Sequence, residues 1–191
     1  MSGRLLGQEC IGDLCLVDGS RATVLHFWQW AFSDLKQNNV RGVFSEWLVA
    51  QILGLELPKC RESWDAYDLI TPNGTAIEIK SAAYLQSWHD ETCKPSSIVF
   101  SGLKGQTWSP KAGFSGIATY NADVYVFCLQ TCTDASCWDA TDINQWRFAY
   151  LKKAVLEAQV LKSLSLKRLM ALTNLLTAAE LRQEFQKEGF I

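Results

Sequence analysis

The sequence predicts a single mixed α/β domain. The chain has 191 residues, of which 48% are hydrophobic, and this suffices for one substantial core. Two early segments have helical periodicity, whereas "ADVYVFCLQ" and "WRFAYLKK" further along have the apolar character of buried strands. A tight hairpin lies between these two groups. We therefore expect one domain over residues 1–191, with a core at about 40–152 and a helical tail at 153–191.

The first two expected elements are helices. Ser20 is a suitable N-cap for a helix over residues 21–36, in which apolar side chains recur at helical spacing. A second helix, at 41–54, ends at Gly54, which suits a helix C-terminus.

The second helix carries an acidic residue where burial is expected. It is apolar on nearly every side, yet Glu46 lies on the same stripe as Val49 and Leu53. A buried carboxylate is unfavourable unless a cation or hydrogen-bond donor pairs with it. Glu46 is therefore expected to have a partner.

A hairpin follows in "DLITPNGTAIEIK", with strands near 66–71 and 75–82. Pro72 and Asn73 suit the two central positions of a type I turn, and Gly74 suits the left-handed residue that follows. This loop pairs the residues on its two sides and thereby fixes the register of the strands.

The predicted register places charges together on one face. Asp68 lies opposite Glu78, and Lys80 lies on the same face two residues further along. Leu69 and Ile77 lie on the other face and fit the core, so a one-residue slip would bury the charges. Two carboxylates with β-carbons about 5 Å apart repel in a dry site, so either one binds a proton or a cation lies between them. Carboxylate oxygens suit Mg2+ or Mn2+, with Lys80 beside the metal; an exposed face with unrelated charges is the alternative.

The sequence predicts the secondary structure of some of the remaining segments clearly and leaves that of others open. Residues 93–119 are rich in Gly, Ser and Pro, and they fit either a helix or a mobile loop. The two apolar strands, at 122–130 and 146–153, come next. Short amphipathic helices end the chain, one after Ser165 and one opened by the capping box that begins at Thr177.

These acidic residues and the lysine resemble the PD-(D/E)xK superfamily of restriction-endonuclease-like nucleases. In that superfamily a helix carries an acid, a strand carries an Asp, and the next strand carries E-x-K or D-x-K. Glu46 matches the helix acid, Asp68 matches the strand aspartate, and "IEIK" supplies Glu78 and Lys80. The resemblance covers roughly residues 40–130.

The resemblance implies a restriction-endonuclease-like αβββαβ core with a mixed central sheet flanked by helices, plus an N-terminal helix and a C-terminal helical tail. It also implies Mg2+-dependent cleavage of DNA phosphodiester bonds, with Mn2+ as a substitute metal. Asp68, Glu78 and Glu46 would be the metal ligands, and Lys80 would orient the attacking water or stabilise charge on the phosphorus. A homodimer that cuts both strands is a further expectation of the family.

Three positions depart from the family pattern or leave it open. Tyr67 stands where proline often precedes the strand aspartate. Asp65 is a rival metal ligand, although the predicted register favours Asp68. Gln86 follows Lys80 closely enough to line the site, but a hydrogen-bonded surface glutamine is the alternative.

The charge balance restricts how nucleic acid would be bound. The formal net charge of −2 argues against a protein that coats nucleic acid, so any phosphate contacts must be local. The candidates for such contacts are Arg41, Lys94, Lys104 and Lys111. A solvated basic loop is the alternative for the lysines. Two other functions stay open, namely a nuclease-like scaffold that binds nucleic acid or protein without cutting, and a hydrolase of another phosphate ester.

The cysteines and the N-terminus suggest a cytoplasmic protein. Seven cysteines without a secretory signal indicate reduced thiols rather than a disulfide framework. Cys128, Cys132 and Cys137 cluster, but no histidine lies near them in sequence and no C-x2-C pair is present, so a zinc site is not the favoured interpretation. No apolar stretch is long enough to predict a membrane span.

Overall fold

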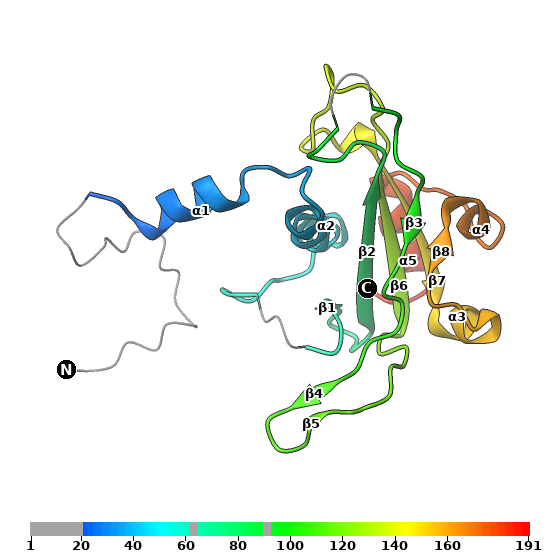
Figure 1. Ribbon diagram of the computed structural model, residues 1–191. Coiled ribbons are helices and arrows are strands. Elements are labelled where there is room, and N and C mark those ends of the chain that lie inside the picture. Colours follow the sequence, from blue (N-terminus) through cyan, green and yellow to red (C-terminus); the bar gives the residue numbers. More distant parts are fainter. Residues whose placement is uncertain (1–20, 62–64, 90–92) are drawn as a thin grey trace, which may run out of the picture.

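A computed structural model of the protein describes residues 21–61, 65–89 and 93–191, and its centre is a mixed four-stranded sheet (Figure 1). The sheet has the order β1-β2-β6-β7, with β2 and β6 parallel and the two outer pairs antiparallel. Its strands are β1 (Leu69–Ile70), β2 (Ala76–Ala83), β6 (Val124–Gln130) and β7 (Trp146–Lys152). The predicted mixed α/β class is confirmed.

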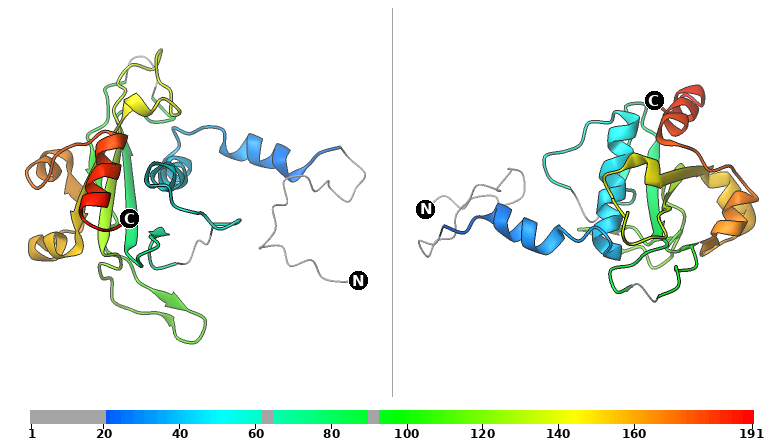
Figure 2. Two further views of the ribbon diagram at one scale, coloured as in Figure 1. Left: turned by 180° about the vertical axis from the view of Figure 1, so that it is seen from behind. Right: turned by 90° about the horizontal axis from the view of Figure 1, so that it is seen from above.

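Helices pack on both faces of this sheet (Figures 1 and 2). The helices that pack on the sheet are α2 (Asn38–Leu53), α3 (Lys153–Gln159), α4 (Leu166–Met170) and α5 (Ala178–Lys187). The described chain also contains α1 (Val24–Phe32) and a short 3-10 helix, η1, at Ile143–Gln145. One apolar cluster joins α2 and α5 to a sheet face, through side chains such as Val49, Ile77 and Phe185. A second cluster joins α3 and α4 to the opposite face, through Leu156, Leu169 and their neighbours. Burial of both faces explains why all seven residues of β6 are buried.

The hairpin has the predicted turn and register. Gly74 has a φ of 82°, and the Thr71 amide donates to the Thr75 carbonyl at 3.0 Å. Leu69 pairs with Ile77, as the turn chemistry predicts. However, β1 has only two residues and is shorter than the predicted strand at 66–71.

The first two helices are found near their predicted positions, with two corrections. α1 begins after Thr23, whose side chain accepts from the backbone of His26, whereas the predicted cap Ser20 lies outside the described residues. None of the residues of α1 is buried, and the helix projects away from the sheet (Figure 2). α2 is not buried on every side, because Val43 and Trp47 are 46% and 49% exposed.

The connection from β2 to β6 differs from the expected αβββαβ order. The described part of this connection contains β3 (Val99–Phe100), β4 (Trp108–Ser109) and β5 (Gly113–Phe114), and no helix. β4 and β5 form a hairpin that extends from one end of the molecule (Figure 1), whereas β3 pairs with β8 (Leu164–Ser165) from the tail. The expected helix before the last core strand is therefore not found in the described part of this connection.

The tail contains the predicted capping box, and it contains one helix, α3, where a helical tail but no individual helix was predicted. The Thr177 side chain accepts from the Glu180 amide, and the Glu180 carboxylate accepts from the Thr177 amide, so α5 begins as expected. α3 follows β7 with no break, and its N-cap Lys152 makes no side-chain cap.

Substitutions at Gly42, within α2, and at Gly54, its C-cap, are expected to have opposite effects on stability. Gly54 has a φ of 72° and caps the helix through its amide, so Gly54→Ala is expected to lower the free energy of unfolding by about 1 kcal/mol. Gly42 lies within the helix with no atom within 4 Å of an added β-carbon. Gly42→Ala is therefore expected to raise it by about 0.5–1 kcal/mol. Urea denaturation measures both changes, and equal effects of one sign would contradict this assignment.

Within the described ranges, none of the helices combines the length and apolar character that a membrane crossing requires.

Candidate functional site

The candidate site lies where β1 stops and leaves the edge of β2 open. The ladder between β1 and β2 contains the pairs Leu69–Ile77 and Ile70–Ala76, so Asp68 lies just outside it. The Asp68 amide donates to the Ile77 carbonyl at 3.0 Å, and the Ile79 amide donates to Asp68 Oδ2 at 2.6 Å. Asp68 was predicted to pair with Glu78 in the ladder; instead its carboxylate takes the position of a strand acceptor for β2. This bond fixes the carboxylate at the sheet edge.

Glu78 and Lys80 come from β2, as predicted, and they contact each other. Lys80 Nζ lies 2.5 Å from Glu78 Oε1, and both side chains are about one-fifth exposed, at 21% and 18%. Their partners in β6 are the buried residues Tyr125 and Phe127. The loop after β3 passes over the lysine, since a β-carbon at Gly102 would lie 3.9 Å from Nζ. The ammonium group is therefore confined between the sheet and this loop.

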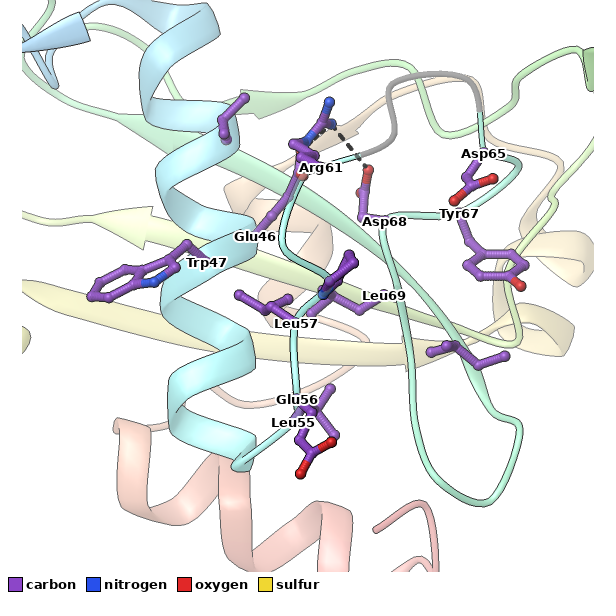
Figure 3. Close-up of a pocket in the computed structure, with 13 residues that line it drawn as sticks. Glu46, Trp47, Leu55, Glu56, Leu57, Arg61, Asp65, Tyr67, Asp68 and Leu69 are labelled. Atoms are coloured by element: carbon purple, nitrogen blue, oxygen red, sulfur yellow. Dashed lines mark hydrogen bonds and ion pairs between the residues drawn. The ribbon is translucent and has the colours of Figure 1, made fainter. Parts of the chain in front are cut away.

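Glu46 has the partner that its burial requires, and the partner is Arg61. The guanidinium donates from Nε to Glu46 Oε2 at 2.5 Å and from Nη2 to Glu46 Oε1 at 2.7 Å. The same Nη2 lies 3.9 Å from Asp68 Oδ1. Figure 3 shows the arginine between the two carboxylates. Arg61 is thus a site residue that the sequence alone did not identify.

Two cavities meet at Asp68. The larger, of about 280 Å³, has mostly apolar walls and includes Glu46 and Arg61. The smaller, of about 130 Å³, is lined by Glu78 and by Tyr125. Asp68 lines both cavities, so it connects the arginine side of the site with the lysine side.

Burial raises the pKa of all three carboxyl groups, Glu46, Asp68 and Glu78, above their ordinary values, and it is the largest cause for each. The positive charge of Lys80 lowers the pKa of all three, and the hydrogen bond from Arg61 lowers that of Glu46. The charge on Asp68 raises the pKa of Glu78 further. The site therefore holds negative charge that is poorly solvated and that a nearby cation stabilises.

These pKa shifts predict how stability depends on pH. The folded protein keeps the Glu78 proton above pH 4.5, the ordinary value for this group, whereas the unfolded chain releases it. As the pH rises from 4.5 through the raised pKa, the contribution of Glu78 to the free energy of unfolding decreases. Glu78→Gln removes this contribution, so the variant should gain stability relative to wild type as the pH rises. Urea denaturation at a series of pH values measures the difference, and a pH-independent difference would contradict the prediction.

The carboxylate oxygens of the site are suitable ligands for a divalent metal, but they are paired with cationic side chains of the protein. Carboxylate oxygens from Glu46, Asp68 and Glu78 are the ligands that Mg2+ and Mn2+ prefer. In the part of the chain that the structure describes, no three His, Cys, Asp or Glu side chains form a ready-made group for a metal ion. Arg61 and Lys80 bind these carboxylates instead.

Arg41, a predicted phosphate contact, and Gln86, a possible residue of the site, are both buried. Arg41 is only 5% exposed, and its guanidinium donates to the Lys36 carbonyl, to Asn38 and to Gln86. This burial does not fit the predicted contact of Arg41 with phosphate. Gln86 is also buried, and its amide donates to the Ala83 carbonyl at 2.8 Å. Gln86 is therefore hydrogen-bonded as the alternative proposed, but in the interior and not at the surface.

The remaining predicted residues lie around the site. Asp65 is exposed and lines both cavities, so it stays a rival ligand to Asp68. Lys104 does not line the smaller cavity, although its chain neighbours Leu103 and Gly105 do, and its Nζ is 4.8 Å from the centre of the Tyr120 ring. Lys111 is exposed in the loop between β4 and β5, and Lys94 is also exposed.

The cysteine cluster is divided between a strand and a loop. Cys128 is fully buried in β6, and burial raises the pKa of its thiol. Cys132 and Cys137 lie in the loop before β7, with their sulfur atoms 3.6 Å apart. Cys137 is exposed and Cys132 is half-buried, and neither lines the two cavities at Asp68.

Comparisons of the chain with protein families, with curated proteins and with solved structures found no match.

Proposed function

We propose that the protein is a Mg2+-dependent DNA endonuclease that resembles the PD-(D/E)xK nucleases. The observation that carries the proposal is the arrangement of Asp68, Glu78 and Lys80 at one open strand edge, beside a polar cavity. The order of α2, β1 and β2 and the adjacent parallel strand β6 agree with the start of such a core. The helix-free connection after β2 is a departure from it.

Each residue of the site would have a distinct role in the proposed cleavage. Asp68 and Glu78 would hold the metal, with Glu46 as a further ligand, and the metal would supply Lewis-acid stabilisation of the phosphate. Asp68 is fixed for this role by its bond from the Ile79 amide. Lys80, confined under the loop at Gly102, would place a positive charge beside the phosphate and orient the attacking water.

The DNA would approach across the smaller cavity and the β4–β5 hairpin. Lys104 and Lys111 come from the segment that forms this side of the molecule, and they would supply local phosphate contacts that the net charge of −2 does not. A homodimer would present two such sites to the two strands of a duplex.

The test combines metal binding with cleavage. Mn2+ is titrated calorimetrically into wild type and into a variant with Asp68→Asn and Glu78→Gln, and both proteins are assayed for plasmid nicking with Mg2+, Mn2+ or a chelator. We expect wild type to bind Mn2+ and nick DNA only with metal, and the variant to do neither. No metal binding by wild type would overturn the proposal. A panel of single-stranded, duplex and branched DNA and RNA separates DNA cleavage from the hydrolysis of another phosphate ester.

A second candidate function is a nuclease-like scaffold that binds nucleic acid or a protein without cutting. The exposed aromatic side chains of α1 favour it, since Phe27, Trp30 and Phe32 are 52%, 83% and 50% exposed. A scaffold of this kind would bind its partner equally well with metal or with a chelator. Metal-dependent nicking would exclude it.

A further inference from the structure

Arg61 occupies the position at which a cation would neutralise Glu46 and Asp68 together. It makes a two-point contact with Glu46, the geometry in which guanidinium binds carboxylate most strongly, and it reaches Asp68 at 3.9 Å. The two carboxylates are largely shielded, with 13% and 17% of their side chains exposed. Arg61 is thus the paired cation of Glu46, and together with Lys80 it offsets the charge of Asp68.

We infer that Arg61 is a built-in counter-ion that competes with the divalent metal for Glu46 and Asp68 and so sets the metal affinity of the site. This inference rests on the proposed function, because it takes these carboxylates to be metal ligands. A guanidinium group and a divalent cation cannot share the same oxygens without strong repulsion. Metal binding therefore requires that Arg61 move away from at least Asp68.

The surroundings of Arg61 allow such a movement. Its side chain is 42% exposed, unlike those of the carboxylates that it binds, and it borders the larger cavity of about 280 Å³. Solvent can therefore hydrate the guanidinium group once it has moved away. Glu46 and Asp68 stay shielded from solvent and still require a cation. Because guanidinium stays charged at any pH at which the protein is folded, the competition does not depend on deprotonation of Arg61.

The exchange also changes the charge presented to a phosphate. Three carboxylates and two cationic side chains, Arg61 and Lys80, form the site without metal. When a divalent ion binds the carboxylates in place of Arg61, the positive charge of the guanidinium group lies at the border of the site. The metal-bound site then attracts an anion more strongly than the metal-free site does.

The test measures Mn2+ affinity by calorimetry in wild type, Arg61→Gln, Arg61→Lys and the control Lys59→Gln. Lys59 is exposed in the same loop, so its loss removes an equal charge from a nearby position. We expect Arg61→Gln to bind Mn2+ about tenfold more tightly than wild type, because a competing charge is lost. Arg61→Lys should lie between the two, and Lys59→Gln should stay within about twofold of wild type.

Melting temperature gives a second readout that does not depend on catalysis. Without metal, Arg61→Gln should melt below wild type, because Glu46 loses its paired cation and Asp68 loses one of two nearby cations, and Mn2+ should raise its melting temperature more than it raises that of wild type. Unchanged or weaker Mn2+ binding in both Arg61 variants, with normal binding by wild type, would overturn the inference alone. Absence of Mn2+ binding in wild type and in every variant would overturn the proposed function and the inference with it.

Discussion

Asp68→Asn should reduce Mg2+-dependent nicking by about a hundredfold or more, with little change in the fold. The side chain has two separable tasks, since Oδ2 accepts from the Ile79 amide and Oδ1 faces Arg61. An asparagine oxygen can still accept from Ile79, but the residue has lost the negative charge that holds a metal. The initial rate of plasmid nicking and the Mn2+ affinity measure the loss, and circular dichroism verifies the fold.

The matched control is Asp123→Asn. The Asp123 carboxylate also accepts from an amide of β2, that of Ala76 at 2.9 Å, but it lies at the start of the strand. The same chemical change there should leave nicking within about twofold of wild type. Equal losses in the two variants would mean that Asp68 supports the strand and not the chemistry.

Lys80→Met should separate catalysis from metal binding. Methionine retains much of the apolar stem under the loop at Gly102, but it removes the ammonium group that contacts Glu78 at 2.5 Å. Nicking should fall by about a hundredfold, since a preorganised positive charge beside the phosphate is lost. Mn2+ affinity should stay the same or increase, because Glu78 no longer shares its charge with the lysine.

Lys152→Met is the control for Lys80→Met. Lys152 extends from β7 and its Nζ lies 2.6 Å from Glu188 Oε2, so it also forms an ion pair at the sheet. Its loss should leave both nicking and metal affinity close to those of wild type. A fall in Mn2+ affinity in Lys80→Met alone would contradict the assigned role and would indicate that the lysine supports the metal ligands.

Local chemistry explains which parts of the fold the sequence predicts well. Pro72, Asn73 and Gly74 determine the turn among themselves, and the turn determines the register without reference to the rest of the chain. The same holds for Gly54 at the end of α2 and for the capping box at Thr177. Each signal lies within a few residues of the feature that it specifies.

Features that depend on distant partners were not predicted. Burial required a partner for Glu46, but nothing in the sequence around Arg61 marks that residue as the partner, 15 positions away. Arg41 is a candidate phosphate contact by sequence, whereas in the fold it is buried and one of its three partners, Gln86, lies 45 positions away. The charge of a residue alone does not reveal whether the fold supplies an internal acceptor.

The missed elements have the same cause. α3 begins at Lys153 directly after a strand, and its N-cap, Lys152, is not one of the residue types that favour the start of a helix. β3 and β8 are two residues long each and form only because the pairing of Phe100 with Leu164 unites distant segments. Their positions follow from tertiary packing and not from propensity.

The shortness of β1 also affects how the edge of the sheet is protected from strand addition by another chain. β1 covers two residues of the eight-residue β2, so in the described sheet the remaining length of that edge has no strand beside it. An unpaired edge is a template on which another chain can add a strand. Asp68 already binds the Ile79 amide, and its charge would be desolvated by any incoming strand. The carboxylate proposed for catalysis is thus also placed where it would oppose the addition of a strand from another chain to this edge.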